Sequence, residues 1–134
     1  MIQVTMKKTK LNKISPHATQ SNQENSDEVI MVLTNLPDRA SAERIAQTLI
    51  AEHLAACVNI MAECGSVYRW QGKIEAANEV PVFIKTTRGV YPRVAETILA
   101  HHPYELPEVI AVTIDLGLPA YLKWVQQALK PTST

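Results

Sequence analysis

The side chains of this sequence best suited to chemistry are metal ligands. Imidazole, carboxylate and thiolate groups suit copper and zinc, and the sequence offers them at His101, His102, Glu105, Glu108, Cys57 and Cys64. Adjacent residues of an α-helix point about 100° apart, so the two histidines share an ion only where the backbone leaves the helix. Pro103 favours that departure at His102. The alternative is that both histidines cap a helix and help to pack subunits.

The two cysteines are too few for a disulfide framework. If both lie on one strand, their spacing puts them on opposite faces and roughly 23 Å apart, at ~3.3 Å per residue. A disulfide needs Cα atoms within about 7 Å, so we predict two free thiols, as in a reducing cytoplasm. Cys57 is either a buried packing residue or a further metal or redox ligand. We expect Cys64, beside Gly65, at the surface, where it can oxidise or capture metal.

Aromatic and charged side chains form a second group of candidates. Tyr68 and Trp70 lie two apart on a predicted hairpin arm, so they share one face and are expected at a subunit contact. Lys85 is a candidate anion contact, and the alternative is a solvated or interface charge. The candidates for a trimer contact or a cleft are Tyr68, Trp70, Lys85, Tyr104, Glu105 and Trp124.

Enzyme motifs are missing from the sequence. It contains no G-x-S-x-G elbow, no P-loop and no G-x-G-x-x-G fingerprint. Pro107 separates Glu105 from Glu108 and predicts a turn there rather than an acid–base pair. We therefore expect a protein that is not an enzyme.

Composition narrows the partners and the location. The 134 residues carry 13 Lys+Arg and 13 Asp+Glu. The chain therefore lacks the broad positive field that attracts nucleic acids and anionic membranes. No apolar stretch approaches the ~20 residues of a membrane span, and no apolar segment follows the N-terminal lysines as in a signal peptide. We expect a cytoplasmic protein that binds neither nucleic acid nor membrane.

Hydrophobic periodicity predicts the elements that position these residues. Residues 1–26 are a polar extension, and residues 27–134 form one domain. Strands are expected at 28–34, at 56–64 continuing past Gly65 into 66–70, and at 79–87, with a hairpin turn at Gln71-Gly72; the fourth strand is expected at 108–114. Helices are expected after Asp38, between Gly89 and His102, and around residues 121–129. The order βαββαβα predicts an α+β, ferredoxin-like sandwich with an extra C-terminal helix.

Pro81 and Gly65 mark irregularities in the predicted sheet. Proline cannot donate to a strand ladder, so Pro81 should face an edge, a bulge or the start of its strand. Gly65 is expected to break or bulge the preceding strand. One sheet face has no predicted helix to cover it, which suggests an oligomer.

Several segments together resemble the CutA family of divalent cation tolerance proteins. They are SAERIAQTLIAEHLAACVNI, SVYRWQGKIE, IKTTR, HHPYELPEVIAV and GLPAYLKWV, and the resemblance covers about residues 29–129. It implies a PII-like homotrimer in which strands of neighbouring subunits extend one another's sheets. It also implies a response to divalent metal ions, with copper bound by His101, His102 and a first-strand cysteine. Thr34 replaces that cysteine here, and a hydroxyl is a poorer copper ligand than a thiolate.

Two other functions are compatible with the same sequence. One is a PII-like signalling or scaffold trimer that binds a small anionic ligand or a partner protein between subunits. The other is an assembly module whose interleaved strands remove open sheet edges.

Overall fold

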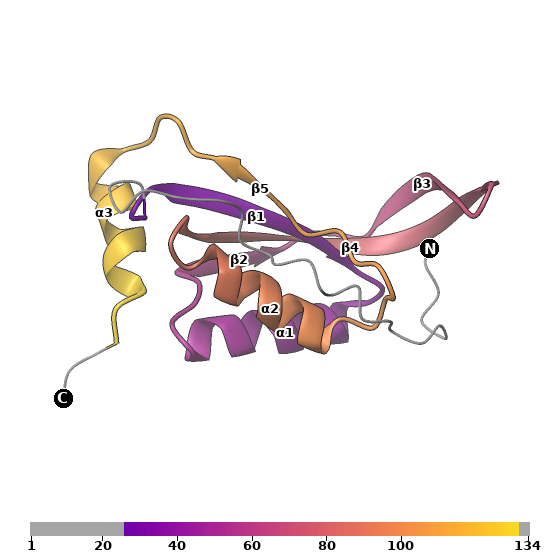
Figure 1. Ribbon diagram of the computed structural model, residues 1–134, viewed down its shortest axis with the longest axis horizontal. Helices are drawn as coiled ribbons and strands as arrows, with labels where there is room; N and C mark the ends of the chain where they lie inside the picture. The colour runs from indigo at the N-terminus through magenta and orange to yellow at the C-terminus, as the bar shows by residue number, and fades with distance from the viewer. Residues whose placement is uncertain (1–25, 132–134) are drawn as a thin grey trace.

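A computed structural model describes residues 26–131. An antiparallel sheet carries two helices on one face, and a third helix lies at one end of the sheet (Figure 1). The elements in order are β1 (Val29–Leu36), α1 (Arg39–Ala51), β2 (Cys57–Ile60), β3 (Cys64–Trp70), β4 (Lys73–Thr87), α2 (Tyr91–His101), β5 (Ile110–Thr113) and α3 (Pro119–Ala128). The predicted α+β, ferredoxin-like class with an extra C-terminal helix is confirmed.

The described residues bear on the N-terminal extension and on the question of a membrane-spanning helix. Apart from Ser26, the polar extension expected at residues 1–26 lies outside the described residues. Within residues 26–131, no helix has the length and apolar character needed to cross a bilayer.

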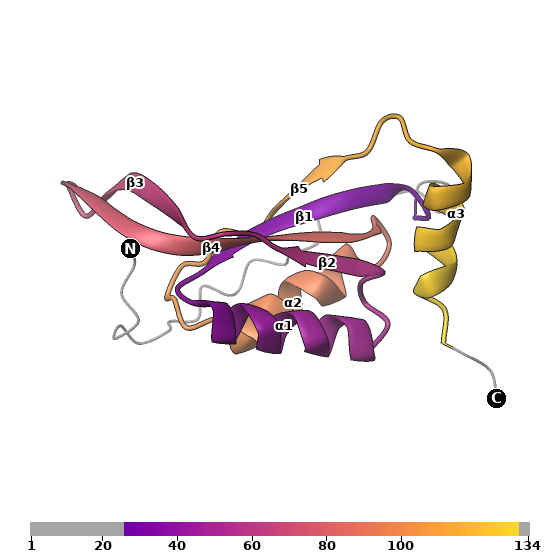
Figure 2. The same ribbon diagram turned by 180° about the vertical axis from the view of Figure 1, so that it is seen from behind.

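Strand β4 is the longest element and organises the sheet. Of its 15 residues, 80–87 pair with β1 on one side. On the other side, residues 82–85 pair with β2 and residues 73–79 pair with β3. The sheet order is β2-β4-β1-β5, so β5 is the free strand on the far side of β1. The β3–β4 hairpin projects beyond the helices (Figure 2). Its turn is the predicted Gln71-Gly72 pair, with φ of 51° and 80°, as a two-residue hairpin turn requires.

The irregularity opposite Pro81 separates β2 from β3. Ile60 pairs with Val82 and Cys64 pairs with Glu79, so three residues on one side face two on the other. Pro81 has no N–H to offer at this bulge, and its carbonyl accepts the N–H of Met61 at 2.9 Å. The expectation that Pro81 sits at a bulge is confirmed.

The break predicted at Gly65 was wrong. Gly65 lies inside β3, opposite Asn78, and the strand expected over 56–64 is instead interrupted at 61–63. The reason is Pro81 on the partner strand β4. The hydrophobic pattern of residues 56–64 alone does not show this.

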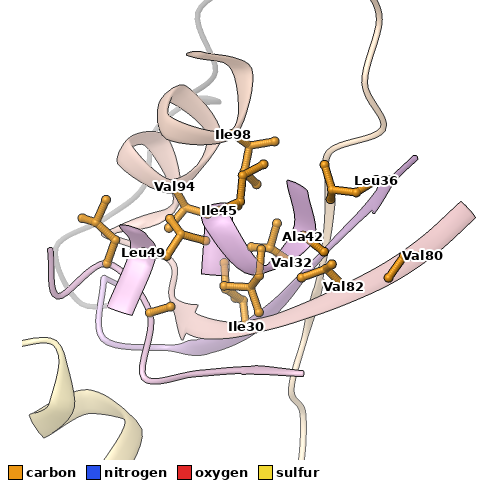
Figure 3. Close-up of a cluster of buried hydrophobic side chains, with 13 residues drawn as sticks. Ile30, Val32, Leu36, Ala42, Ile45, Leu49, Val80, Val82, Val94 and Ile98 are labelled. Carbon is orange, nitrogen blue, oxygen red and sulfur yellow. The ribbon is translucent and has the colours of Figure 1, made fainter. Parts of the chain in front are cut away.

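The core lies between the sheet and helices α1 and α2 (Figure 3). Alternate residues of β1 and β4 point toward the helices, as the period of two in a strand requires. The labelled side chains that meet there are Ile30, Val32, Leu36, Ala42, Ile45, Leu49, Val80, Val82, Val94 and Ile98. This cluster fixes α1 and α2 on one face, so the other face is left without these helices, and α3 contacts the sheet at its end.

Asp38 begins α1. Its Oδ1 accepts the backbone N–H of Ser41 at 2.8 Å and the Ser41 hydroxyl at 3.0 Å. These two bonds lower the pKa of Asp38 below its ordinary value, and the bond from the backbone N–H has the larger effect. The cap therefore satisfies one of the free N–H groups at the helix start.

Replacing Asp38 tests this cap. Asp38→Ala should lower the free energy of unfolding at pH 7 by about 1 kcal/mol, measured by urea denaturation at one fixed protein concentration. Because the folded-state pKa is depressed, the carboxylate stabilises the protein above its ordinary pKa of 3.8, and this contribution disappears as the pH falls through the folded value. The difference from the wild type should therefore shrink in acid. Asp115→Ala, at an exposed position, is the control and should change little; equal effects of both variants would contradict the cap.

Candidate functional site

His102 is a buried link between the end of α2 and strand β1. Its Nε2 lies 2.7 Å from the carbonyl oxygen of Asn35, and its Nδ1 accepts the backbone N–H of Tyr104 at 3.2 Å. Because Nδ1 accepts, the ring proton is on Nε2 and is donated to Asn35. Both ring nitrogens are thus used within the protein. Coordination of a metal by His102 requires that one of these bonds opens.

Pro103 explains why the two histidines differ. Helix α2 ends at His101, and His102 has extended backbone angles, φ −82° and ψ 135°. The predicted departure from the helix before Pro103 is confirmed. It turns His102 into the protein and leaves His101 exposed on the helix.

His101 keeps one ring nitrogen available. Its Nδ1 lies 2.9 Å from the carbonyl oxygen of Thr97 and therefore carries the proton. No residue in the described range bonds its Nε2. His101 also lines a groove between α1 and α2 of about 310 Å³, whose other lining residues are Ser41, Arg44, Ile45, Gln47 and Thr48.

Thr34, the position where the resemblance implies a cysteine ligand, lies in β1 next to Asn35. It is buried on the sheet face that packs against the helices, and its hydroxyl has no hydrogen-bond partner within the described residues. Within residues 26–131, no three histidine, cysteine, aspartate or glutamate side chains lie close enough to hold one metal ion. Within the described residues, no third histidine, cysteine, aspartate or glutamate therefore joins His101 and His102 at one metal site.

A buried polar pair adjoins His102. The Tyr104 hydroxyl donates to Oε2 of Glu79 at 3.0 Å, and both side chains are almost fully buried, at 2% and 1% exposed. Burial raises the pKa of Tyr104 above its usual value, and the bond to Glu79 raises it further. The rings of His102 and Tyr104 lie 4.7 Å apart, so the three residues form a continuous contact.

Sequence reasoning did not single out Glu79. The available signal was a charged residue beginning the apolar run EVPVFI, where a buried carboxylate needs a partner. The neighbouring carboxylates differ: Oε1 of Glu105 is buried with no described hydrogen-bond partner, and Glu108 accepts a bond from the Asn35 amide at 3.0 Å.

The cysteines are both free, as predicted. Cys57 is half-buried in β2 opposite Lys85, and Cys64 is exposed at the start of β3. The Lys85 ammonium donates to the side chain of Asn59. Neither thiol belongs to a group of three ligands within the described part of the chain.

The remaining aromatic candidates are at opposite ends of the sheet. Tyr68 and Trp70 lie on the projecting β3–β4 hairpin, where the Tyr68 hydroxyl donates to Glu75 at 3.2 Å. Trp124 lies on α3 at the other end, with its ring 5.6 Å from that of Tyr121 (Figure 1). One chain alone therefore does not combine them into a cleft.

Removal of the Tyr104 hydroxyl tests the buried pair. Tyr104→Phe takes a hydrogen-bond donor from a buried carboxylate and should lower the free energy of unfolding by about 1–3 kcal/mol. Tyr68→Phe removes the same kind of bond on the hairpin surface and should change it by less than about 0.5 kcal/mol. Denaturant unfolding of both variants at one concentration measures the difference. A Tyr104→Phe protein as stable as the wild type would show that the pair does not stabilise the fold.

Comparison with known proteins agrees with this fold. A family model described as CutA1 divalent ion tolerance protein matches residues 30–128. Protein CutA of Mus musculus is 41% identical over 97 residues, which are 72% of this chain and 55% of that protein. Divalent-cation tolerance protein CutA of Thermus thermophilus is 40% identical over 97 residues, 72% of this chain and 94% of that protein. The chain thus spans about half of the mouse relative and nearly all of the bacterial one.

Solved structures give the same result. CutA from Xylella fastidiosa is 42% identical, with a TM-score of 0.73, and the match covers 77% of this chain and 99% of that one. CutA1 from Oryza sativa is 36% identical, with a TM-score of 0.75 over 78% of this chain and 96% of that one. The resemblance inferred from the sequence motifs is confirmed. The chain belongs to the CutA1 family of divalent ion tolerance proteins.

Proposed function

We propose that this protein acts in divalent cation tolerance as a non-enzymatic cytoplasmic homotrimer that binds copper at the end of α2. Family membership supports the role in metal tolerance. The observation that carries the assembly is an apolar sheet face that α1 and α2 leave uncovered. The observation that carries metal binding is the available Nε2 of His101.

The open sheet face is apolar across three strands. Since Ile30 and Val32 point toward the helices, Met31 and Leu33 point the other way. The strand register then places a set of side chains on that face: Met31, Leu33, Phe83, Ile110 and Val112, with Lys85 and Cys57 beside them. Val112 is 45% exposed in the single chain. A contiguous apolar surface of this kind marks a protein–protein contact.

The free edges favour copies of the same chain as the partner. Strand β5 pairs only with β1, and β2 and β3 pair only with β4, within the described residues. Unpaired edges offer hydrogen bonds to another strand. The projecting hairpin also carries Val67 and Ile74, at 73% and 71% exposed, so it supplies an apolar surface that reaches beyond its own subunit. A closed ring of subunits would cover both kinds of surface.

Light scattering tests the assembly. The wild type should have three times the chain mass of 14.9 kDa. Val112→Lys places a charge on the open face and should shift the protein to smaller species, because burial of an unpaired charge is costly. Ile50→Lys is the matched control, because Ile50 is 44% exposed on α1 but faces away from the sheet. A monomeric wild type, or a Val112→Lys trimer as stable as the control, would contradict the interface.

For metal binding, we propose His101 as the primary copper ligand. Its Nε2 is accessible, and copper accepts imidazole nitrogen readily. His102 contributes a second nitrogen only after a bond to Asn35 or Tyr104 opens, so its main effect is on the position of the α2 end.

Calorimetric titration with Cu(II) separates the two histidines. His101→Ala should abolish saturable binding without a large loss of stability. His102→Gln should keep the binding and lower the free energy of unfolding by about 1–3 kcal/mol, because the Tyr104 N–H loses its acceptor. His53→Asn is the control, since asparagine tolerates the positive φ of 58° at that position. Copper binding that survives in His101→Ala would refute this assignment.

A further inference from the structure

We propose that Arg69, on the projecting hairpin of one subunit, forms an ion pair with Glu105 of a second copy of this chain. This inference rests on the proposed homotrimer and names a charged contact between its subunits.

Glu105 needs a hydrogen-bond donor that its own chain does not supply. Its Oε1 is shielded from solvent and has no hydrogen-bond partner among residues 26–131. Two donors of this region are already used, because the Tyr104 hydroxyl donates to Glu79 and the Asn35 amide donates to Glu108. A carboxylate oxygen that is removed from water without a donor costs free energy. A partner that brings a cation to this oxygen is therefore favoured.

Glu105 lies near the base of the β3–β4 hairpin. Its neighbour Tyr104 bonds to Glu79, and Glu79 pairs with Cys64 at the first position of the hairpin ladder. From this point the hairpin runs outward, away from the helices (Figure 2). A second chain that packs along this end of the sheet would meet the Glu105 carboxylate.

Arg69 is a cation near the tip of the same hairpin. It is exposed, and it forms no ion pair with a carboxylate of the described residues. It lies five residues beyond Cys64, roughly 17 Å along the strand at ~3.3 Å per residue. This separation from the hairpin base keeps Arg69 from Glu105 of its own chain, so a pair of these two residues joins two chains.

The surroundings of the two charges match. Arg69 is directly opposite Ile74 and two residues from Val67, so the three side chains share one face of the hairpin. Leu106, beside Glu105, is 50% exposed. A cation between apolar side chains can thus meet a carboxylate next to an apolar side chain. A guanidinium donates two parallel N–H bonds to one carboxylate, and the apolar neighbours exclude water from the pair.

A double-mutant cycle on the full chain tests the contact. Sedimentation over a dilution series gives the concentration at which half of the chains are in trimers, in urea chosen to bring the wild type into range. Arg69→Gln and Glu105→Gln should each raise this concentration at least about tenfold, because each leaves one partner of a desolvated pair alone. The double variant should be no weaker than the weaker single variant. Lys73→Gln, on the opposite face of the hairpin, and Glu96→Gln, exposed on α2, should behave as the wild type.

Exchange of the two charges gives a second readout. Arg69→Glu and Glu105→Arg should each weaken association more than the glutamine variants, since each places like charges together. Both changes in one chain restore opposite charges at the contact. That chain should associate more tightly than either single variant, which a purely structural role of the two side chains would not produce.

The possible failures are separable. A monomeric wild type would refute the proposed assembly itself. A trimeric wild type would refute only this ion pair if the two glutamine variants matched their controls, if their effects multiplied in the double variant, or if the charge exchange gave no recovery.

Discussion

The pairing of one long strand with three others is the constraint on which this structure depends. Strand β4 aligns β1, β2 and β3, and its core-facing residues support both helices. It also continues beyond the helical layer, so the same strand is buried at one end and exposed at the other. Pro81 lies between these two parts, where a missing N–H is compatible with the bulge.

A second set of contacts holds the end of α2 against this sheet. His102 bonds to β1, the ring of Tyr104 lies beside it, and the Tyr104 hydroxyl reaches Glu79 on β4. Three segments distant in sequence are thus joined by buried polar bonds, which are strong only while every member is satisfied. The position of His101 at the groove follows from the same contacts, because they determine where the helix stops.

Much of the fold was predictable because it depends on local patterns. The strand alternation, the Asp38 cap, the Gln71-Gly72 turn and the effect of Pro103 each act within a few residues. The interruption at 61–63 was not predictable in this way, since its cause is on the opposite strand. The sequence also could not show that His102 points inward and His101 outward, because this depends on the carbonyl of Asn35, 67 residues away. Glu79 was missed for the same reason, as its partner is 25 residues distant.

The projecting β3–β4 hairpin has a consequence for how folding and association are coupled. A two-stranded ribbon in water is marginally stable, because it has no core of its own to bury apolar side chains. Its outer part, with Val67 and Ile74, therefore gains little from the fold of its own subunit. In the proposed trimer, neighbouring subunits would supply most of the free energy that keeps this ribbon paired. The order of the ribbon would then depend on protein concentration, whereas that of the helical body would not. Substitutions in the two regions would then act on different equilibria, association in the ribbon and unfolding in the body.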